Sequence, residues 1–270
     1  ATAGNLLFAG RNAGRLTALT HAQGLNVVAG YTWQFDSVGR ITRFTNPDGA
    51  VDYLYDPNGQ LTYADHTGSG LTDETYSYDL SGNRTLAGYS TGTDNRLLSD
   101  GVHTYEYDAE GNRPRQVTIA TGESVDYAYD HRNRLTSVIH RDSFGAATHQ
   151  VRYTYDLGDR RIGVEIDLNA DGVYELQTWS VFDGEDPVLA FDAVGTLTHR
   201  YLPGPQIDQI LAEESAAGVY WLLPDHQGSI RDVVDNILTL IDHVQYDSFG
   251  RWSSRTSSTY KPRFGDTGRE

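Results

Sequence analysis

The sequence predicts an all-β fold: a spiralling sheet of stacked β-hairpins with little helix. The first observation is a recurring four-residue motif, aromatic-x-aromatic-Asp, in which x is any residue. The second is a glycine three positions after most of these aspartates, and the third is the near absence of helical periodicity. The chain has 270 residues with 28 Gly and 18 Tyr, a composition typical of many short strands joined by tight turns.

The segment from Tyr53 to Leu61 shows what one unit does. Tyr53 and Tyr55 should lie on one face of a strand, because side chains alternate with a period of two. Asp56 can accept hydrogen bonds from backbone N–H groups of the following turn, and Gly59 can supply the positive φ of a type I turn with a following bulge. Leu61 then begins a second strand. Each unit is therefore predicted to be one β-hairpin.

Units of this kind recur along the chain. A lone hairpin is marginal in water, so only the stacked array is expected to be stable. The residues predicted to carry the aromatic faces and the turns are Tyr53, Tyr55, Asp56, Gly59, Tyr76, Tyr78, Asp79, Gly82, Tyr105, Tyr107, Asp108, Gly111, Tyr127, Tyr129, Asp130, Tyr153, Tyr155 and Asp156. Asn133 stands where most units have glycine, and Asn tolerates left-handed geometry. Further copies begin at Trp33, Phe191 and Tyr246, and the opening "NAGRLTAL" resembles the tail of another unit.

The pattern indicates two regions, a hairpin array over residues 1–200 and a second region over residues 201–270. The boundary is placed at "YLPGPQ", where two prolines and a changed composition interrupt the repeats. The best helix candidate in the chain is "DQILAEESAAG", from Asp208 to Gly218, which is long enough for one or two turns.

Composition excludes several classes of function. The net charge of −16 argues against nucleic-acid binding, because phosphate contacts need clusters of Lys and Arg. No apolar run is long enough to predict a membrane span, and no N-terminal leader is visible. The chain has no cysteine, so disulfides contribute nothing, and it has no methionine, from which we expect an internal piece of a longer protein.

Three segments near the C-terminus, together with the repeats, carry a family likeness. The stretch "DHQGSIR" resembles the opening of the Rhs-associated core domain, with Asp225, His226, Gly228, Ser229 and Arg231 in the matching positions. The stretch "YDSFG", with Tyr246, Asp247, Phe249 and Gly250, resembles a second core segment in which proline usually replaces Ser248, and the end of the chain, Phe264 to Glu270, resembles a third. The aromatic-Asp units are similar to the YD repeats of Rhs proteins, teneurins and toxin-complex C subunits.

The resemblance implies a structural role. It implies a β shell that encloses an attached C-terminal polypeptide, often a toxin, in a larger bacterial protein that is secreted or displayed at the cell surface. Some members cleave themselves with aspartates in a segment beyond the last motif, and this chain ends before that segment, so the resemblance extends to the scaffold and not to an enzyme. The alternative is a glycan- or surface-binding β-repeat module of a secreted protein, because exposed tyrosine faces can stack on sugars.

One loop has the pattern of a calcium site. Acidic or amide side chains alternate and are followed by glycine, as in the first half of a calcium loop, and the candidate ligands are Asp167, Asn169, Asp171, Val173 and Glu175. Thr178 occupies the position where an EF-hand has its bidentate Glu, so a full EF-hand is excluded. A polar hairpin turn is the alternative and needs no cofactor.

Other groups of residues that could form catalytic, zinc or sugar sites are better explained by structural roles. Asp225, His226 and Ser229 could be drawn as a catalytic triad, but triads assemble from distant segments, so a turn with a capping Asp is favoured. No pair of histidines has the i, i+4 spacing of a zinc motif. The tyrosine faces are interpreted first as cross-strand packing and only second as sugar platforms.

Overall fold

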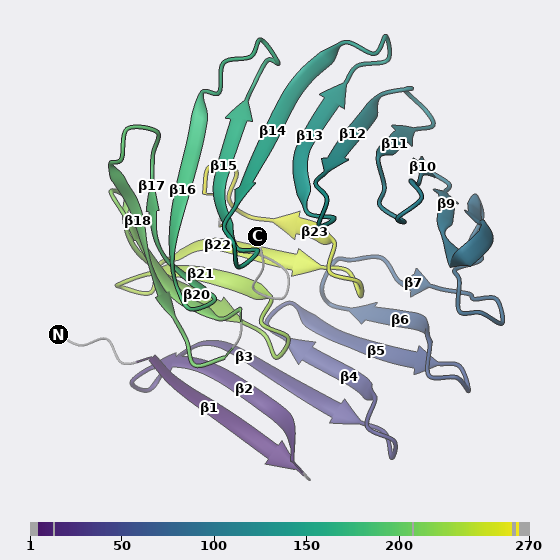
Figure 1. The fold of residues 1–270 in the computed structure, drawn as a ribbon. Coiled ribbons are helices and arrows are strands. Elements are labelled where there is room, and N and C mark those ends of the chain that lie inside the picture. Colours follow the sequence, from purple (N-terminus) through teal and green to yellow (C-terminus); the bar gives the residue numbers. More distant parts are fainter. Residues whose placement is uncertain (1–4, 13, 207, 261–262, 265–270) are drawn as a thin grey trace. The chain divides into compact units, whose positions relative to one another are not determined.

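The structure is a computed structural model, and it describes residues 5–12, 14–206, 208–260 and 263–264 (Figure 1). Its strands are β1 (Asn5–Asn12), β2 (Arg15–Gln23), β3 (Asn26–Phe35), β4 (Ile41–Asn46), β5 (Gly49–Tyr55), β6 (Leu61–Thr67), β7 (Glu74–Thr75), β8 (Tyr89–Thr91), β9 (Leu97–Asp100), β10 (His103–Glu106), β11 (Arg115–Thr118), β12 (Ser124–Tyr129), β13 (Leu135–Arg141), β14 (Ala147–Tyr155), β15 (Arg161–Asp167), β16 (Leu176–Asp183), β17 (Asp186–Phe191), β18 (Leu197–Pro203), β19 (Ile210–Ser215), β20 (Gly218–Pro224), β21 (Ile230–Asp235), β22 (Leu240–Tyr246) and β23 (Trp252–Arg255).

The strands form two sheets in which each strand pairs with its neighbours in sequence. One sheet runs in the order β1 to β7 and the other in the order β8 to β23. The paired strands are antiparallel, as at β5 and β6, where Tyr53 lies opposite Ala64. The predicted all-β class and the stacking of successive hairpins are therefore confirmed.

The expected helix between Asp208 and Gly218 is wrong. This segment forms the hairpin of β19 and β20, in which Ala212 lies opposite Trp221. Ile210 and Ala212 are buried on alternating positions, which suits a strand packed on one face. The burial of that face outweighs the weak local helix propensity of the segment. Within the described residues the only helical turn is a 3₁₀ turn at Thr93–Asn95, and none of them belongs to a helix that could cross a membrane.

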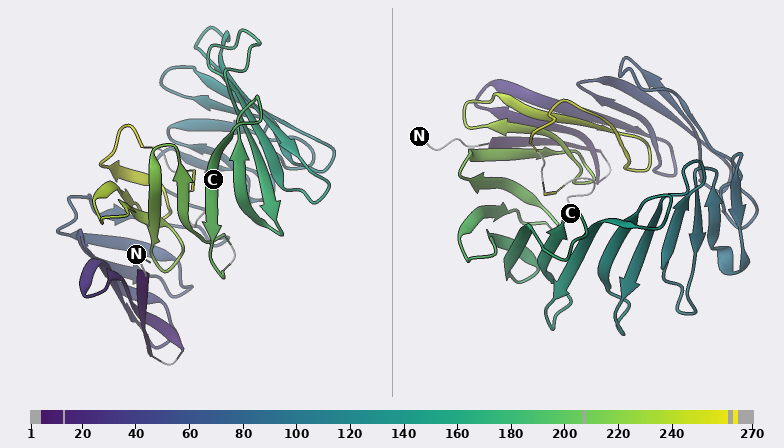
Figure 2. Two further views of the ribbon diagram at one scale, coloured as in Figure 1. Left: turned by 90° about the vertical axis from the view of Figure 1, so that its left-hand side faces the viewer. Right: turned by 90° about the horizontal axis from the view of Figure 1, so that it is seen from above.

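Two compact units can be distinguished in the chain. Unit 1 comprises residues 1–76 and 200–270, and unit 2 comprises residues 77–199. In unit 2 the strands β8 to β17 form a single layer (Figure 2), and few of its side chains are fully buried; these are Ser124, Asp167, Ser180 and Ala190. The division of the chain into a repeat array over residues 1–200 and a core-like region over residues 201–270 stays a prediction.

Unit 1 contains a hydrophobic core cluster. Alternate residues of β3 point to one face, and Ala29, Tyr31 and Trp33 on that face pack with Leu19 and Phe44. The rings of Trp33 and Phe44 are stacked with their centroids 5.6 Å apart. Burying aromatic rings of this size removes a large apolar area from water and so stabilises unit 1.

Polar side chains join the N-terminal and C-terminal strands of unit 1. The Tyr31 hydroxyl donates a hydrogen bond to Asp232 Oδ2 at 3.1 Å. His243 lies between two carboxylates, with Nδ1 2.6 Å from Asp232 Oδ1 and Nε2 2.8 Å from Asp48 Oδ1. These hydrogen bonds raise the pKa of His243 to about 10, against the opposing effect of burial. The imidazolium form therefore joins strands from the two ends of the chain at neutral pH.

His243→Gln is expected to remove a stabilisation that depends on pH. Because the pKa of His243 is raised from 6.5 to about 10, the stabilisation is complete below about pH 6.5 and is lost as the pH rises towards 10. Urea unfolding between pH 6 and pH 10 should show wild type approaching the variant as the pH rises. His131→Gln, at an exposed turn position of unit 2, is the control and should follow the wild-type curve. A constant difference between wild type and His243→Gln would contradict this assignment.

Candidate functional site

The repeated turn is the structural element that organises the chain, and Asp56 shows its geometry. The Asp56 N–H donates to Gln60 O at 2.9 Å and the Gly59 N–H donates to Asp56 O at 3.0 Å. Asp56 Oδ1 also accepts the Gln60 N–H at 2.8 Å. Gly59 has a φ of 84°, and the strand register shifts between Leu54 and Tyr55. This is the turn and bulge expected from the motif.

The same two backbone hydrogen bonds close many other turns. They begin at Asp36, Asp79, Asp108, Asp130, Asp142, Asp156, Asp192, Asp225, Asp235 and Asp247. Asn133 and Asp159 occupy the left-handed position of their turns with φ of 59° and 68°, in place of glycine. The turns at Asp142 and Asp235 were not expected from the sequence. The first shares "DSFG" with the turn at Asp247, a signal that could have identified it, whereas the second has Leu238 in the left-handed position and carries no glycine signal.

In five units the tyrosine before the turn binds the hairpin that precedes it. The Tyr55 hydroxyl donates to Ile41 O at 2.7 Å, and the guanidinium of Arg40 lies 4.8 Å from the centre of the Tyr55 ring. Arg40 and Ile41 are the fourth and fifth residues after Asp36, so one unit supplies the surface on which the next tyrosine docks. The same hydroxyl-to-backbone bond is made by Tyr107 to Leu97, Tyr129 to Arg113, Tyr155 to Leu135 and Tyr246 to Ile230.

The other tyrosine of each pair has varied partners. In unit 2, the guanidinium of Arg113 lies 5.2 Å from the ring of Tyr105 and 4.9 Å from the ring of Tyr127, and Arg161 lies 5.0 Å from the ring of Tyr153. Tyr105 also donates to Asp100 Oδ2 at 2.7 Å. These rings are half-buried, and their arginine partners cover part of the surface that a sugar would need.

Two tyrosines on either side of the division between the units have partners of another kind. Tyr76 of unit 1 donates to Glu74 and packs its ring 4.9 Å from that of Phe249. Tyr78 of unit 2 forms an isolated β-bridge with Arg84. The turn at Asp79 and Gly82 therefore joins a short two-residue pairing rather than two full strands.

Side chains four residues after the turn position link successive turns of unit 2. Asn112 donates from Nδ2 to Asn133 Oδ1 at 3.0 Å. Arg134 donates from Nη1 to Asp156 O at 3.2 Å and to Asp159 Oδ1 at 2.8 Å. Asn83, Arg96, Asn112, Arg134 and Arg160 make such links in order along the sheet, and we call them the turn ladder. In the sequence these positions carry no signal beyond their place at the start of the second strand of each hairpin.

Several turn carboxylates have a lowered pKa. The side-chain hydrogen bond from Arg134 lowers the pKa of Asp130 to about 2. The corresponding bonds from Arg40 and Arg160 lower the pKa of Asp36 and of Asp156. Carboxylates held in this way accept hydrogen bonds and are poor proton donors at neutral pH.

The predicted "DHQGS" motif forms a turn. Asp225 Oδ1 accepts the N–H groups of Gln227 at 2.9 Å and Ser229 at 3.2 Å, and its Oδ2 accepts Arg231 Nε at 2.8 Å. The ring of His226 lies 4.6 Å from that of Trp33. Within the described residues His226 makes no side-chain hydrogen bond, so Asp225, His226 and Ser229 lack the geometry of a triad.

The second core motif is also a turn. Asp247 Oδ1 accepts the N–H groups of Phe249 and Arg251, both at 2.9 Å, and Gly250 has a φ of 83°. Of the third motif, Phe264 is buried and packs against Tyr201, whereas residues 265–270 lie outside the described residues.

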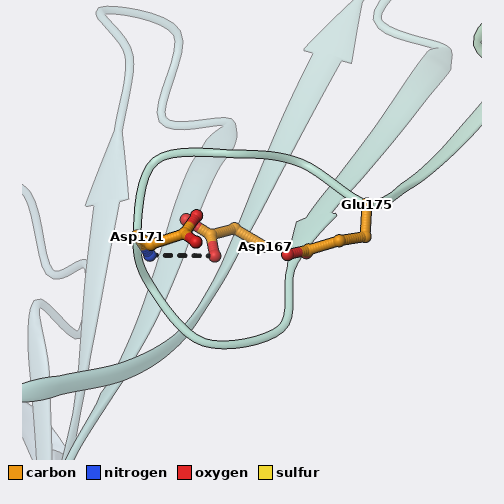
Figure 3. Close-up of side chains that lie close together, drawn as sticks. All are labelled: Asp167, Asp171 and Glu175. Carbon is orange, nitrogen blue, oxygen red and sulfur yellow. Dashed lines mark hydrogen bonds between the residues drawn. The ribbon is translucent and has the colours of Figure 1, made fainter.

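Three of the five candidate calcium ligands come together at the loop between β15 and β16 (Figure 3). One carboxylate oxygen from each of Asp167, Asp171 and Glu175 lies within 4.8 Å of the others. Asp167 is buried, and its carboxylate accepts the N–H groups of Asn169, Asp171 and Gly172 at 2.8–3.3 Å. Desolvation would raise the pKa of Asp167, but these backbone donors lower it.

The loop geometry serves a hairpin turn and leaves lone pairs for a cation. Glu175 Oε2 accepts the Leu168 N–H at 2.8 Å, and Asp171 Oδ1 accepts the Val173 N–H at 2.8 Å. Carboxylate oxygens can accept more than one such bond. Three carboxylates at this spacing suit an oxygen-coordinated ion such as Ca²⁺, and calcium binding stays a prediction.

Tyr55→Ala is expected to destabilise the protein by about 3 kcal/mol, because a large packed ring is removed. Tyr55→Phe should cost about 1 kcal/mol, because only the bond to Ile41 O is lost. Leu54→Ala, at a neighbouring side chain that is 59% exposed, is the control and should change stability by less than about 0.5 kcal/mol. Urea unfolding measures all three. Equal stability of Tyr55→Ala and Leu54→Ala would rule out the docking role of the ring.

Calcium is expected to raise the melting temperature of the full chain if the loop binds it. Saturation at 100 times the dissociation constant adds about 2.7 kcal/mol to the free energy of unfolding. Glu175→Gln should abolish the shift, and Glu185→Gln, which changes an exposed acid in another turn, should retain it. Identical melting curves in calcium and in chelator would remove the ion from consideration.

Similar solved structures come from toxin complexes and from a porin-like protein. The structure of TcdB2–TccC3 with Cdc42 is 13% identical over 95% of this chain and 21% of that chain, with a TM-score of 0.43. The Photorhabdus luminescens Tc holotoxin pore is 13% identical over 94% of this chain and 20% of that chain, with a TM-score of 0.44. A porin-like protein from Bacteroides uniformis is 9% identical over 75% of this chain and 86% of that chain, with a TM-score of 0.35.

These TM-scores are too low to carry an argument. This chain spans about a fifth of the length of the two toxin structures. The family to which the chain belongs is shown by its sequence instead: the family model named Teneurin YD-shell matches residues 12–268. That range includes the repeated turns, the docking tyrosines and the first two core motifs. The chain therefore belongs to the teneurin YD-shell family.

Proposed function

We propose that this chain forms part of the wall of a shell that encloses or presents an attached C-terminal polypeptide of toxin or effector type. Membership of the YD-shell family supports a structural shell role. The observation that carries the proposal is the docking of five turn tyrosines on the preceding hairpins, as Tyr155 donates to Leu135 O at 2.8 Å. A wall built in this way extends by adding units.

The side-chain chemistry supports a wall more than an active site. The turn aspartates accept hydrogen bonds from their own turns and from arginine, as Asp130 does from Arg134. We propose no enzymatic activity for this chain, and self-cleavage belongs at most to a longer parent. We expect the parent to be a larger bacterial protein that is secreted or displayed at the cell surface.

Glycan or surface binding is the alternative function. The structure gives it limited support, because arginines cover the rings of Tyr55 and Tyr155 and their hydroxyls are used by the backbone. Binding on a glycan array that is lost when half-exposed tyrosines are replaced would favour this alternative.

Protease protection in the longer parent tests the shell proposal. A cleavage site inserted in the polypeptide that follows this chain should resist protease while the protein is folded and should be cut after unfolding in urea. The same polypeptide produced without this chain is the matched control and should be cut in both states. Cutting of the site in the folded parent as fast as in the control would contradict enclosure.

A further inference from the structure

A pocket lies within unit 1, apart from the turn ladder and the Asp167 loop. It has a volume of about 340 Å³ and is bordered by β4, β5 and β6 and by the turns at residues 225–228 and 247–250. Its apolar lining includes Phe44, Val51, Tyr55, Leu61 and Phe249. Pockets of this size that combine apolar walls with a few polar groups are typical ligand sites.

Arg231 presents a fixed pair of donors to this pocket. Its Nε donates to Asp225 Oδ2 at 2.8 Å, and Asp225 has a fully buried side chain. The guanidinium lies 4.8 Å from the ring centre of Tyr246 and 5.7 Å from that of Phe44. Its two Nη groups have no acceptor among the residues that the structure describes. Arg231 is therefore held in place by Nε while its outer donors remain unused.

Tyr53 adds a third unused polar group. It lines the same pocket, and its hydroxyl has no hydrogen-bond partner in the described part of the chain. Burial raises the pKa of Tyr53, although the charge of Arg231 opposes the shift. The hydroxyl therefore stays protonated and can donate.

Arg231 is a cation of this pocket, and it is already paired with Asp225. The lining also contains two acids: Asp48, whose Oδ1 lies 2.8 Å from His243 Nε2, and Asp247, whose carboxylate accepts backbone N–H groups. A second carboxylate on Arg231 would have no further cation to neutralise it. Because an uncompensated charge in a partly buried site is costly, a neutral acceptor fits the unused donors better.

We propose that this pocket binds a neutral ligand that presents a carbonyl or amide oxygen to Arg231 Nη and the Tyr53 hydroxyl, and an aromatic or aliphatic group to the apolar walls. Donors fixed before binding lose little entropy when the ligand arrives, which favours a defined pose. The site does not depend on the proposed shell function, because every group that forms it lies within unit 1.

Three probes that share a phenyl ring test the proposal with the full chain. N-acetylphenylalaninamide is neutral and has carbonyl acceptors, N-acetylphenylalanine adds a carboxylate, and phenethylamine has no carbonyl. Titrations followed by ¹H–¹⁵N NMR should show the neutral amide binding most tightly. The shifted amides should cluster at Gln227, Arg231 and Ser248, which line the pocket.

Tyr53→Phe should weaken binding of the neutral amide by about three- to tenfold, because one donor is removed and the ring is kept. The variant should melt no lower than wild type, since the hydroxyl bonds to no described residue. Tyr63→Phe is the matched control, because Tyr63 lies outside the pocket lining and donates to Asp73; it should bind as wild type does.

Several results would overturn the proposal. They are tightest binding by phenethylamine, tightest binding by the carboxylate, unchanged affinity in Tyr53→Phe, and absence of saturable shifts at the pocket with all probes. The last result would mean that ordered water alone satisfies Arg231 and Tyr53.

Discussion

The docking of one tyrosine on the hairpin before it is the constraint on which the array depends. A YD turn alone closes a hairpin, as at Asp56 and Gly59, but it does not hold that hairpin to the next. The hydroxyl of Tyr55 bonds to Ile41 O and its ring lies beside Arg40. Each unit therefore contributes both the ring and the surface that the following ring needs, and the spacing between them is set by one turn. In unit 2, where few side chains are fully buried, these contacts and the turn ladder replace much of the missing core.

Much of the fold could be predicted because its determinants are local. Alternating tyrosines, a capping Asp and a left-handed glycine act within a few residues, so they can be identified in sequence. The hairpin at residues 210–224 was missed because contacts that hold it come from far along the chain, as where the buried Glu213 accepts a hydrogen bond from the Tyr260 hydroxyl. The ladder roles of Asn112 and Arg134 were missed for a similar reason, since their partners lie 21 to 25 residues away. The turn at Asp235 has Leu238 where glycine was the expected signal.

The candidate sites also differ in whether their residues are close together or far apart in sequence. The residues of the loop at Asp167 are close in sequence and come together as the spacing suggested. The "DHQGS" motif was identified as a turn because a capping Asp acts on its own turn, and Asp225 does so. The pocket in unit 1 could not be predicted, because Tyr53 and Arg231 are joined only by the packing of strands far apart in sequence. Local chemistry is visible in the sequence, whereas convergence of distant side chains is not.

Unit 1 is built from the two ends of the chain, and this affects how the chain folds during synthesis. Strands of unit 2 pair with their sequence neighbours, so these contacts can form hairpin by hairpin as the chain leaves the ribosome, with low contact order. Unit 1 instead joins residues 1–76 to residues 200–270. The aromatic face of β3 must therefore wait, partly uncovered, until the last strands are synthesised. During that interval the nascent chain exposes apolar surface, and this is the stage at which a chaperone would be most needed.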